Sequence, residues 1–207
     1  MKRISIAAAA AVIATTAFAQ DNNNAQDWAG AYLGAKSGYN FGAIGSPETS
    51  NEIEVNGAAF ALFAGYNFAT SDKLVLGLET SLGYNLSKKT EGTVGAHYSQ
   101  FKRLFDVEAK ARLGYAVDRF LPFASAGFGL SQQSFETSDV ASSVKDKKTL
   151  VFFTAGAGLD YQVTNKVTLR GEYDYRHYGE TKFKTTGDDT KVKGHDHRVT
   201  FGASYSF

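Results

Sequence analysis

Charged side chains of both signs recur at every second position between residues 167 and 178. Arg170, Glu172, Asp174 and Arg176 would share one face of an extended strand, because successive strand residues point to opposite faces. Two carboxylates beside two guanidinium groups could transfer protons along such a face. The same four charges could also neutralise one another where they pack together, and we expect this packing role.

Four histidines are the other residues with obvious chemistry, because imidazoles brought together can ligate iron, zinc or copper. His97, His177, His195 and His197 all fall near the same end of the predicted strands. His195 and His197 share one face of the last strand, and His177 lies beside them across a hairpin. No carboxylate or thiolate pattern completes a site around them. We therefore predict no metal and no cofactor, with histidines on a wet rim, and keep haem binding as an alternative.

A lipid-modifying hydrolase is a third class of chemistry, since such a site can combine Ser, His and an acid on an outer face. Tyr175, Lys193 and Asp196 lie near the histidines, but no serine occupies a convincing cross-strand position. The sequence also lacks a phosphate-cradling loop, a zinc spacing and a nucleophile elbow. We predict that the protein is not an enzyme.

Charge and cysteine content exclude several partners. The chain has 22 basic and 21 acidic residues, a net charge of +1 and no cysteine. A nearly neutral protein has no basic field to attract phosphates, so we predict no nucleic-acid partner. Without thiols there are no disulfides and no Cys-ligated metal, so stability must come from the sheet itself.

The first residues are typical of a secretory signal peptide. Lys2 and Arg3 precede an apolar stretch, and Ala17-Phe18-Ala19 provides small residues for cleavage. We predict that residues 1–19 are this signal and that residues 20–27, polar and rich in Asn, form a flexible periplasmic lead-in. No stretch approaches the roughly 18 apolar residues that a spanning helix needs.

The rest of the chain alternates in polarity with the period of β-strands. The alternating segments lie near residues 28–41, 54–68, 73–86, 100–116, 121–132, 150–162, 167–178 and 197–207. Short links at 69–72, 117–120 and 163–166 alternate with long polar links through 46–48, 88–90, 138–148 and 179–194. Outer-membrane barrels have this asymmetry, with short periplasmic turns and longer external loops. We predict an all-β fold over residues 28–207, an eight-stranded antiparallel up-and-down transmembrane β-barrel in the bacterial outer membrane. Its loops would be extracellular and both termini periplasmic.

The polar face of these strands should line the lumen. Thirteen glycines fall on the polar faces and only Gly171 on an apolar face, and glycine in a narrow lumen makes room for long neighbours. A Lys or Arg facing lipid at mid-depth would cost about 2 to 4 kcal/mol. We predict a lumen network of paired charges made by Lys36, Glu79, Asp106, Glu108, Lys110, Arg112, Asp160, Arg170, Glu172, Asp174, Arg176 and Arg198.

The apolar face would then meet the bilayer. Leucines such as Leu62, Leu76 and Leu78 fall on it, and tyrosines and phenylalanines near the strand ends suit two interfacial girdles. Trp28, at the start of the first strand, could join the inner girdle.

Several short motifs resemble a known family. These are Trp28-Ala29-Gly30-Ala31-Tyr32-Leu33-Gly34, Ala64-Gly65-Tyr66-Asn67, Gly77-Leu78-Glu79, Arg112-Leu113-Gly114-Tyr115-Ala116 with Leu121-Pro122-Phe123, Arg170-Gly171-Glu172-Tyr173 and the closing segment 198–207. In order and spacing they are similar to the alphaproteobacterial immunogenic outer-membrane and hemin-binding proteins, which are β-barrel surface proteins of the porin-like group.

This resemblance implies a barrel in the outer membrane with roles in envelope integrity and host contact and, for some members, haem binding. Gly202, Tyr205 and Phe207 match the closing-strand signal that the barrel-assembly machinery recognises. The expected partners are therefore outer-membrane lipid, lipopolysaccharide, that machinery, and a host surface or haem. The resemblance supplies no catalytic motif and no haem-ligand motif for this chain.

An open channel is the remaining alternative, because the family label is porin-like. An eight-stranded barrel has an interior that side chains can fill, and twelve ionic residues would fill it. We therefore expect a closed, charge-paired lumen, with structural and contact roles carried by the barrel and its external loops.

Overall fold

The structure is a computed structural model that describes the backbone of residues 24–46, 49–54, 56–87, 91–94, 97–139, 142–184 and 189–207. Side chains are described in residues 24–42, 56–86, 105–132, 149–179 and 194–207. The predicted signal peptide, residues 1–19, lies outside this part of the chain, as do residues 20–23. Within the described residues, no helix is both long and apolar enough to cross a membrane.

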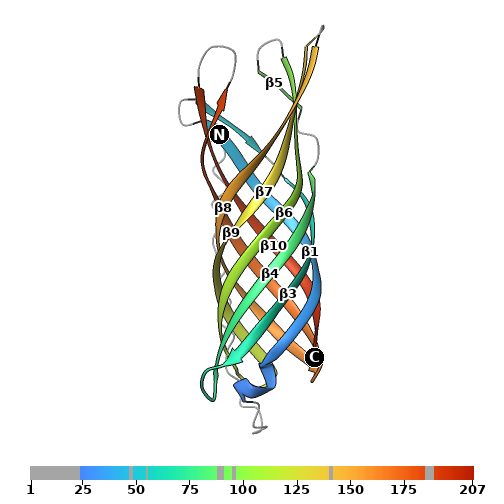
Figure 1. Ribbon diagram of the computed structural model, residues 1–207, viewed down its shortest axis with the longest axis vertical. Helices are drawn as coiled ribbons and strands as arrows, with labels where there is room; N and C mark the ends of the chain where they lie inside the picture. The colour runs from blue at the N-terminus through green and yellow to red at the C-terminus, as the bar shows by residue number, and fades with distance from the viewer. Residues whose placement is uncertain are drawn as a thin grey trace.

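Eight long antiparallel strands in the described chain close into a barrel (Figure 1). They are β1 (Gly30–Ser46), β3 (Gly57–Ala69), β4 (Leu74–Ser87), β6 (His97–Tyr115), β7 (Phe120–Asp139), β8 (Ser142–Thr164), β9 (Val167–Lys184) and β10 (Asp189–Ser206). Each pairs with the next in this order, and β10 pairs with β1 from Tyr32↔Ser206 to Gly45↔Lys193, which leaves these two strands no free edge along that length. The predicted all-β, eight-stranded barrel is confirmed.

The long connections differ from the expected polar loops, because much of their length is strand. β7 and β8 pair as far as Asp139↔Ser142, and β9 and β10 as far as Lys184↔Asp189. Two short strands, β2 (Thr49–Glu54) and β5 (Glu91–Val94), add to the ends of β1 and β6. Antiparallel backbones continue to satisfy their hydrogen bonds by pairing beyond the apolar belt, which lengthens the hairpins.

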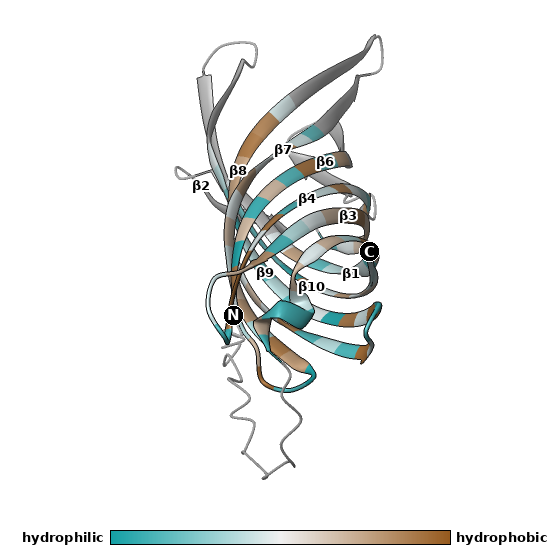
Figure 2. Cartoon of the chain, turned by 60° about the horizontal axis from the view of Figure 1, so that its bottom comes forward, coloured by the Kyte–Doolittle hydropathy of each residue, from teal (hydrophilic) through white to brown (hydrophobic). Residues whose placement is uncertain are grey.

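Side-chain direction follows the predicted alternation. In β3 the residues Ala59, Ala61 and Phe63 are buried, whereas Phe60 and Leu62 are exposed. Figure 2 shows brown and teal residues succeeding one another along single strands. The outward set is apolar and the inward set is largely polar, so the buried interior of this protein is its ionic part.

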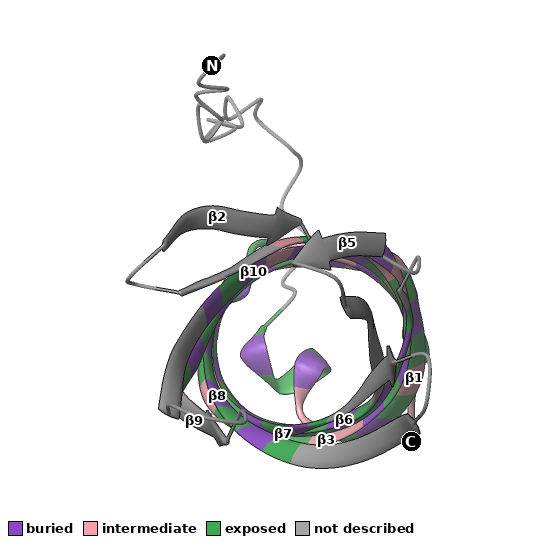
Figure 3. Ribbon diagram, turned by 90° about the horizontal axis from the view of Figure 1, so that it is seen from above, coloured by how far each residue is buried: buried purple, intermediate pink, exposed green. Residues whose placement is uncertain are grey.

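The N-terminal segment is the main departure from the predicted architecture. Ala25–Trp28 form a 3-10 helix, η1, where a flexible lead-in was expected over residues 20–27. Seen from above, η1 lies inside the ring of strands (Figure 3). Asn24 begins it with a capping box, in which the Asp27 side chain returns to the Asn24 backbone.

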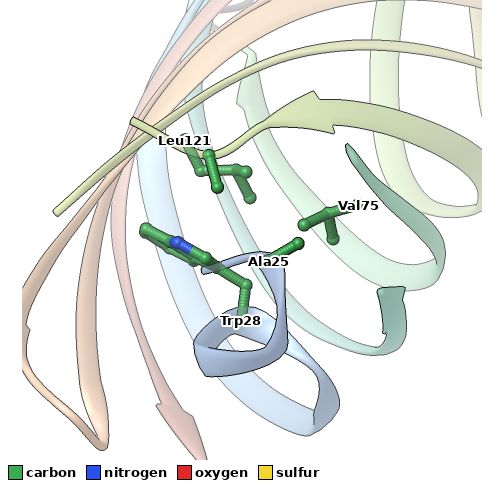
Figure 4. Packing of buried hydrophobic residues seen from close by; sticks show 5 residues of the cluster. Ala25, Trp28, Val75 and Leu121 are labelled. Atoms are coloured by element: carbon green, nitrogen blue, oxygen red, sulfur yellow. The ribbon is translucent and has the colours of Figure 1, made fainter. Parts of the chain in front are cut away.

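Trp28 points into the barrel, so its predicted place in the inner aromatic girdle is wrong. Its side chain is only 7% exposed and packs with Ala25, Val75, Ala116 and Leu121 (Figure 4). Burying an indole against these apolar groups removes more nonpolar surface from water than an interfacial position would. The cluster fills the end of the barrel that carries the short turns.

Candidate functional site

The lumen brings together all twelve charged residues that the sequence analysis placed there. Each is at most 4% exposed, and each forms at least one ion pair with another member of the set. The set divides along the barrel into three connected groups, described here from the short-turn end upward.

The lower group joins two arginines to two carboxylates. Arg170 donates to both Asp160 oxygens, from Nε at 2.7 Å and Nη2 at 2.9 Å, and its Nη1 donates to Glu79. Arg112 Nη2 lies 2.7 Å from Asp160. The Tyr32 hydroxyl donates to Glu79 Oε2 at 2.9 Å and accepts from Arg112 Nη1 at 3.0 Å. Such bidentate, charge-assisted bonds are the strong class of hydrogen bond.

The middle group is built on two lysines. Glu172 accepts from Lys36 Nζ at 2.7 Å and from Lys110 Nζ on its other oxygen. Lys110 also reaches Asp174 at 3.1 Å. Lys36 lies 3.8 Å from Glu79 of the lower group, so the two groups are electrostatically continuous.

The upper group pairs Arg176 and Arg198 with Asp106 and Glu108. Arg176 donates to Glu108 and lies 3.4 Å from Asp106, and Arg198 Nη2 is 3.1 Å from Asp106. Asn40 and Asn85 occupy further bonds of this group: Arg198 Nε donates to Asn40 at 2.7 Å. Asn85 Nδ2 donates to Asp106 at 2.6 Å. Asn40 and Asn85 therefore supply part of the hydrogen bonding that buried charges need, while Asp106 Oδ1, Glu108 Oε1 and Arg176 Nε are buried without a hydrogen-bond partner.

Two of the ion pairs cross the full width of the barrel, whereas others, such as Arg170 with Asp160, join neighbouring strands along its wall. Arg170 on β9 meets Glu79 on β4, and Arg198 on β10 meets Asp106 on β6. In the strand order of the closed barrel, each of these strands lies four positions from its partner, which is the opposite side. Side chains that meet across the full width occupy the space through which solute would pass.

Aromatic side chains inside the barrel were missed by the sequence analysis. Phe63, Phe123 and Phe152 point inward, and guanidinium groups lie over their rings: Arg112 is 3.9 Å from the Phe123 centroid, and Arg176 is 4.6 Å from Phe152. Near the far end, Phe152 packs with Leu150 and Tyr178. Strict position counting could have placed them, because Phe63 shares the parity of Ala61 and Gly65 rather than that of Leu62.

Asp196 was also left out of the predicted network. It is fully buried, has the same parity as Arg198 on β10, and accepts a hydrogen bond from the Tyr178 hydroxyl at 3.3 Å. The sequence analysis had considered it only as a neighbour of the histidines.

Two inward glycines show why the lumen can hold these side chains. A Cβ added to Gly156 would lie 2.5 Å from Asp174 Oδ1, and one added to Gly83 would collide with Asp106. By contrast, a Cβ on the outward Gly171 would meet only Phe201, at an ordinary 3.5 Å.

Three of the histidines, His177, His195 and His197, face outward from the barrel wall. His195 on β10 is directly opposite His177 on β9, and the rings of His195 and His197 are 6.0 Å apart. His97 begins β6, but its side chain lies outside the described set. Within the described side chains, no group of three or more His, Asp or Glu residues is arranged to hold a metal ion.

The sequence of the barrel matches the profile of a known family, the outer membrane protein beta-barrel domain, over residues 5–207. The chain belongs to this family. The chain is also similar to the 25 kDa outer-membrane immunogenic protein of Brucella abortus biovar 1. That protein is 29% identical over 180 residues, covering 87% of this chain and 79% of its own length. The 22 kDa outer membrane protein of Rhizobium leguminosarum bv. viciae is 33% identical over 156 residues, covering 74% and 66% of the two chains. The predicted resemblance is thereby confirmed.

A solved outer-membrane barrel has the same fold. Neisserial surface protein A matches with a TM-score of 0.51 and 17% identity, covering 86% of this chain and 97% of its own. As a member of the outer membrane beta-barrel family, the protein is an outer-membrane surface barrel.

Proposed function

We propose that the protein is a closed outer-membrane scaffold that does not conduct and that contributes to envelope integrity. The observation that carries this proposal is the set of ion pairs between opposite strands, Arg170 with Glu79 and Arg198 with Asp106. Apolar clusters lie on both sides of these charges, with Trp28 and Leu121 at one end and Phe152 and Tyr178 at the other. A hydrated ion would have to displace both the pairs and the clusters.

The proposed orientation places the short turns and both ends of the barrel in the periplasm and the long hairpins outside. Ala25 N donates to Asp72 O, and Ser206 N donates to Lys166 O, so both ends of the barrel domain are bonded to short turns. The elongated β7–β8 and β9–β10 hairpins lie at the opposite end of their strands. These hairpins would present the contact surface to a host or to lipopolysaccharide, because connections are where a rigid scaffold acquires binding specificity.

Conductance in planar bilayers tests the closed lumen. Pure refolded protein is expected to give no large, stable single-channel steps. A variant that removes the two guanidinium groups of the crossing pairs, Arg170→Ala with Arg198→Ala, serves as the opened control and should conduct. Large, regular steps from the unmodified protein would overturn the proposal.

Exchange of the hairpin tips tests the contact role. Tips of β7–β8 and β9–β10 would be replaced by short turns while the strands inside the bilayer stay intact. Binding to host cells or surface antigenicity should fall, whereas heat-resistant barrel mobility on gels should remain. Surface phenotypes that survive every exchange would contradict the role of the hairpins.

Haem binding and catalysis would both have to use the outer wall. We propose that the protein is not an enzyme. The support comes from the surroundings of the outward histidines, which lack a neighbouring serine among the described side chains. Among the described strand residues, Ser37 is the outward-facing serine, and it pairs with Phe201 and Phe60 rather than with a histidine. A hemin titration that gives the same spectral shift after His177, His195 and His197 are replaced by Ala would remove these residues as haem ligands.

A further inference from the structure

The outward face of the barrel is almost free of ionisable groups, which makes one patch stand out. Among the described strand side chains that point outward there is no Lys, Arg, Asp or Glu. The histidines among them, His177, His195 and His197, all lie on β9 and β10 at one height. The outward imidazoles of the described side chains therefore form one group on two adjacent strands.

The patch is a contiguous cluster of imidazole and phenol rings. Tyr175 lies 6.4 Å from His195 and 5.3 Å from His197, measured between ring centroids. The Tyr173 hydroxyl is 2.6 Å from His197 Nδ1. Because this contact occupies Nδ1, the Nε2 atom of His197 is the nitrogen left for a ligand outside the wall. His177 and His195 are exposed, and His197 is half-buried.

The height of the patch corresponds to the outer interface of the bilayer. His177 is ten residues above Val167 on β9, and ten residues of a strand tilted by about 40° rise about 25 Å. The apolar band of an outer-membrane barrel is also about 25 Å tall. If the short turns lie in the periplasm, as proposed above, the patch meets the level at which lipid headgroups of the outer leaflet carry their phosphates.

The electrostatics favour an anion at this position. The neighbouring β1 contributes Tyr39 and Phe41 to the patch, opposite Val199 and His197, and β8 contributes Phe153 opposite His177. No outward carboxylate in the described wall competes for the imidazoles, and the charged Asp196, Arg176 and Arg198 project to the other side of the sheet. Imidazole and phenol donors both suit phosphate oxygens.

We infer that Tyr173, Tyr175, His177, His195 and His197 form a binding site for a phosphate-bearing lipid of the outer leaflet. The lipid phosphate would lie against the imidazoles, and its acyl chains would run down the apolar wall past Val199 and Phe201. The site lies outside the lumen, so it rests on the proposed orientation but not on whether the lumen conducts.

Native mass spectrometry of the refolded, delipidated full chain in detergent tests the site with defined lipids. Bisphosphorylated lipid A is expected to form one preferred adduct, bound about tenfold more tightly than lipid A without phosphates, the effect of one charge-assisted hydrogen bond. The variant H177Q/H195Q/H197Q should lose a similar factor. The matched control is Y84Q/F105Q, because Tyr84 and Phe105 form a cross-strand aromatic pair ten residues above Leu74, at the same height on β4 and β6.

A second variant keeps the test independent of any folding defect. In H195R/H197R two guanidinium donors replace the imidazoles, so affinity for bisphosphorylated lipid A should be retained. Equal binding of phosphorylated and dephosphorylated lipid A would overturn the inference, as would unchanged binding by the glutamine variant. Binding that requires added zinc and disappears with a chelator would assign the patch to a metal instead. None of these outcomes alters the bilayer conductance that tests the closed lumen.

Discussion

The two faces of each strand have opposite chemistry on one backbone. On β9, Arg170, Glu172, Asp174 and Arg176 are buried, while Leu169 and Tyr173, at the alternate positions of the strand, are about half exposed. In a water-soluble protein the buried face would be apolar, because water solvates charge and excludes hydrocarbon. Here the surrounding solvent is hydrocarbon, so the barrel must solvate its own charges with other charges.

Different interactions stabilise the two faces. Outward residues meet disordered acyl chains and need only be apolar, so their identity is loosely specified. Inward residues must match in charge, length and position, because each buried ion depends on a partner across the lumen. Substitutions should therefore be tolerated very differently on the two faces.

The largest effect is expected from removing Arg170. Its guanidinium group binds both Asp160 and Glu79, and Arg170→Met would leave two carboxylates in the lumen with fewer partners. Loss of one member of a buried pair typically costs about 3 to 5 kcal/mol of unfolding free energy. Urea unfolding of the protein refolded in lipid vesicles measures this loss of unfolding free energy.

The double variant Arg170→Met with Asp160→Leu is the control for this prediction. It removes both charges of one pair and should recover part of the stability, because the interaction energy of contacting residues is not additive. A single variant as stable as the parent would show that lumen water, not pairing, solvates these charges.

A charge on the outer wall should have the next largest effect. Leu62 is 61% exposed in the middle of β3, and Leu62→Arg would place a guanidinium group against acyl chains. The expected loss is about 2 to 4 kcal/mol at mid-depth and at most about 1 kcal/mol near an interface. Val163→Arg, close to the β8–β9 turn, supplies the interfacial control. Unfolding titrations in lipid vesicles measure both losses of unfolding free energy. Equal losses at the two positions would contradict the conclusion that hydrocarbon surrounds the middle of the outer wall.

Two glycines on neighbouring strands compare the faces with the same substitution. Gly156→Ala adds a methyl 2.5 Å from Asp174 Oδ1, whereas Gly171→Ala adds one at 3.5 Å from the Phe201 ring. The inward substitution should destabilise by about 1 to 3 kcal/mol, as overpacking does. The outward one should be neutral or stabilise by up to about 1 kcal/mol through reduced chain entropy. Thermal unfolding of both variants in the same detergent measures the difference in stability. A larger destabilisation by Gly171→Ala than by Gly156→Ala would exclude a tightly filled lumen.

Much of the barrel was predictable from two strong, local constraints. Strand residues alternate with a period of two, and a charged side chain facing lipid at the middle of the bilayer costs free energy. These constraints gave the eight strands, their antiparallel order and the inward direction of all twelve charges. What alternation does not encode is depth along the axis. Phe63, Phe123 and Phe152 occupy positions of inward parity, but they were missed because their apolar side chains resemble those of the outward face.

The ends of the strands were predicted less well than their middles. Beyond the bilayer, outward side chains no longer need to be apolar, so the alternation of polar and apolar residues ends. The outer parts of the β7–β8 and β9–β10 hairpins were therefore predicted to be polar loops. η1 was missed for a different reason. Its short polar sequence, with one apolar pair, is held by residues remote in the chain, through apolar contacts with Val75, Ala116 and Leu121 and hydrogen bonds from Asn67 and Gln162.

The smallest effect is expected at the N-terminal plug, which is η1 (Ala25–Trp28) packed inside the short-turn end of the barrel. Asn67 Nδ2 donates to Trp28 O at 3.1 Å, and Gln162 Nε2 donates to Asp27 O at 3.2 Å. Asn67→Ala removes one bond and should weaken docking of η1 by about 0.5 to 1.5 kcal/mol, with little effect on the barrel itself. Trp28 is the only tryptophan of the chain, so its fluorescence reports the plug directly. Emission should shift to longer wavelength and acrylamide quenching should rise, whereas Asn85→Ala, in the upper ion-pair group, should leave both unchanged. If Asn67→Ala instead lowered the unfolding midpoint as much as Arg170→Met, the plug would be part of the cooperative barrel, and the lumen would act as one unit from end to end.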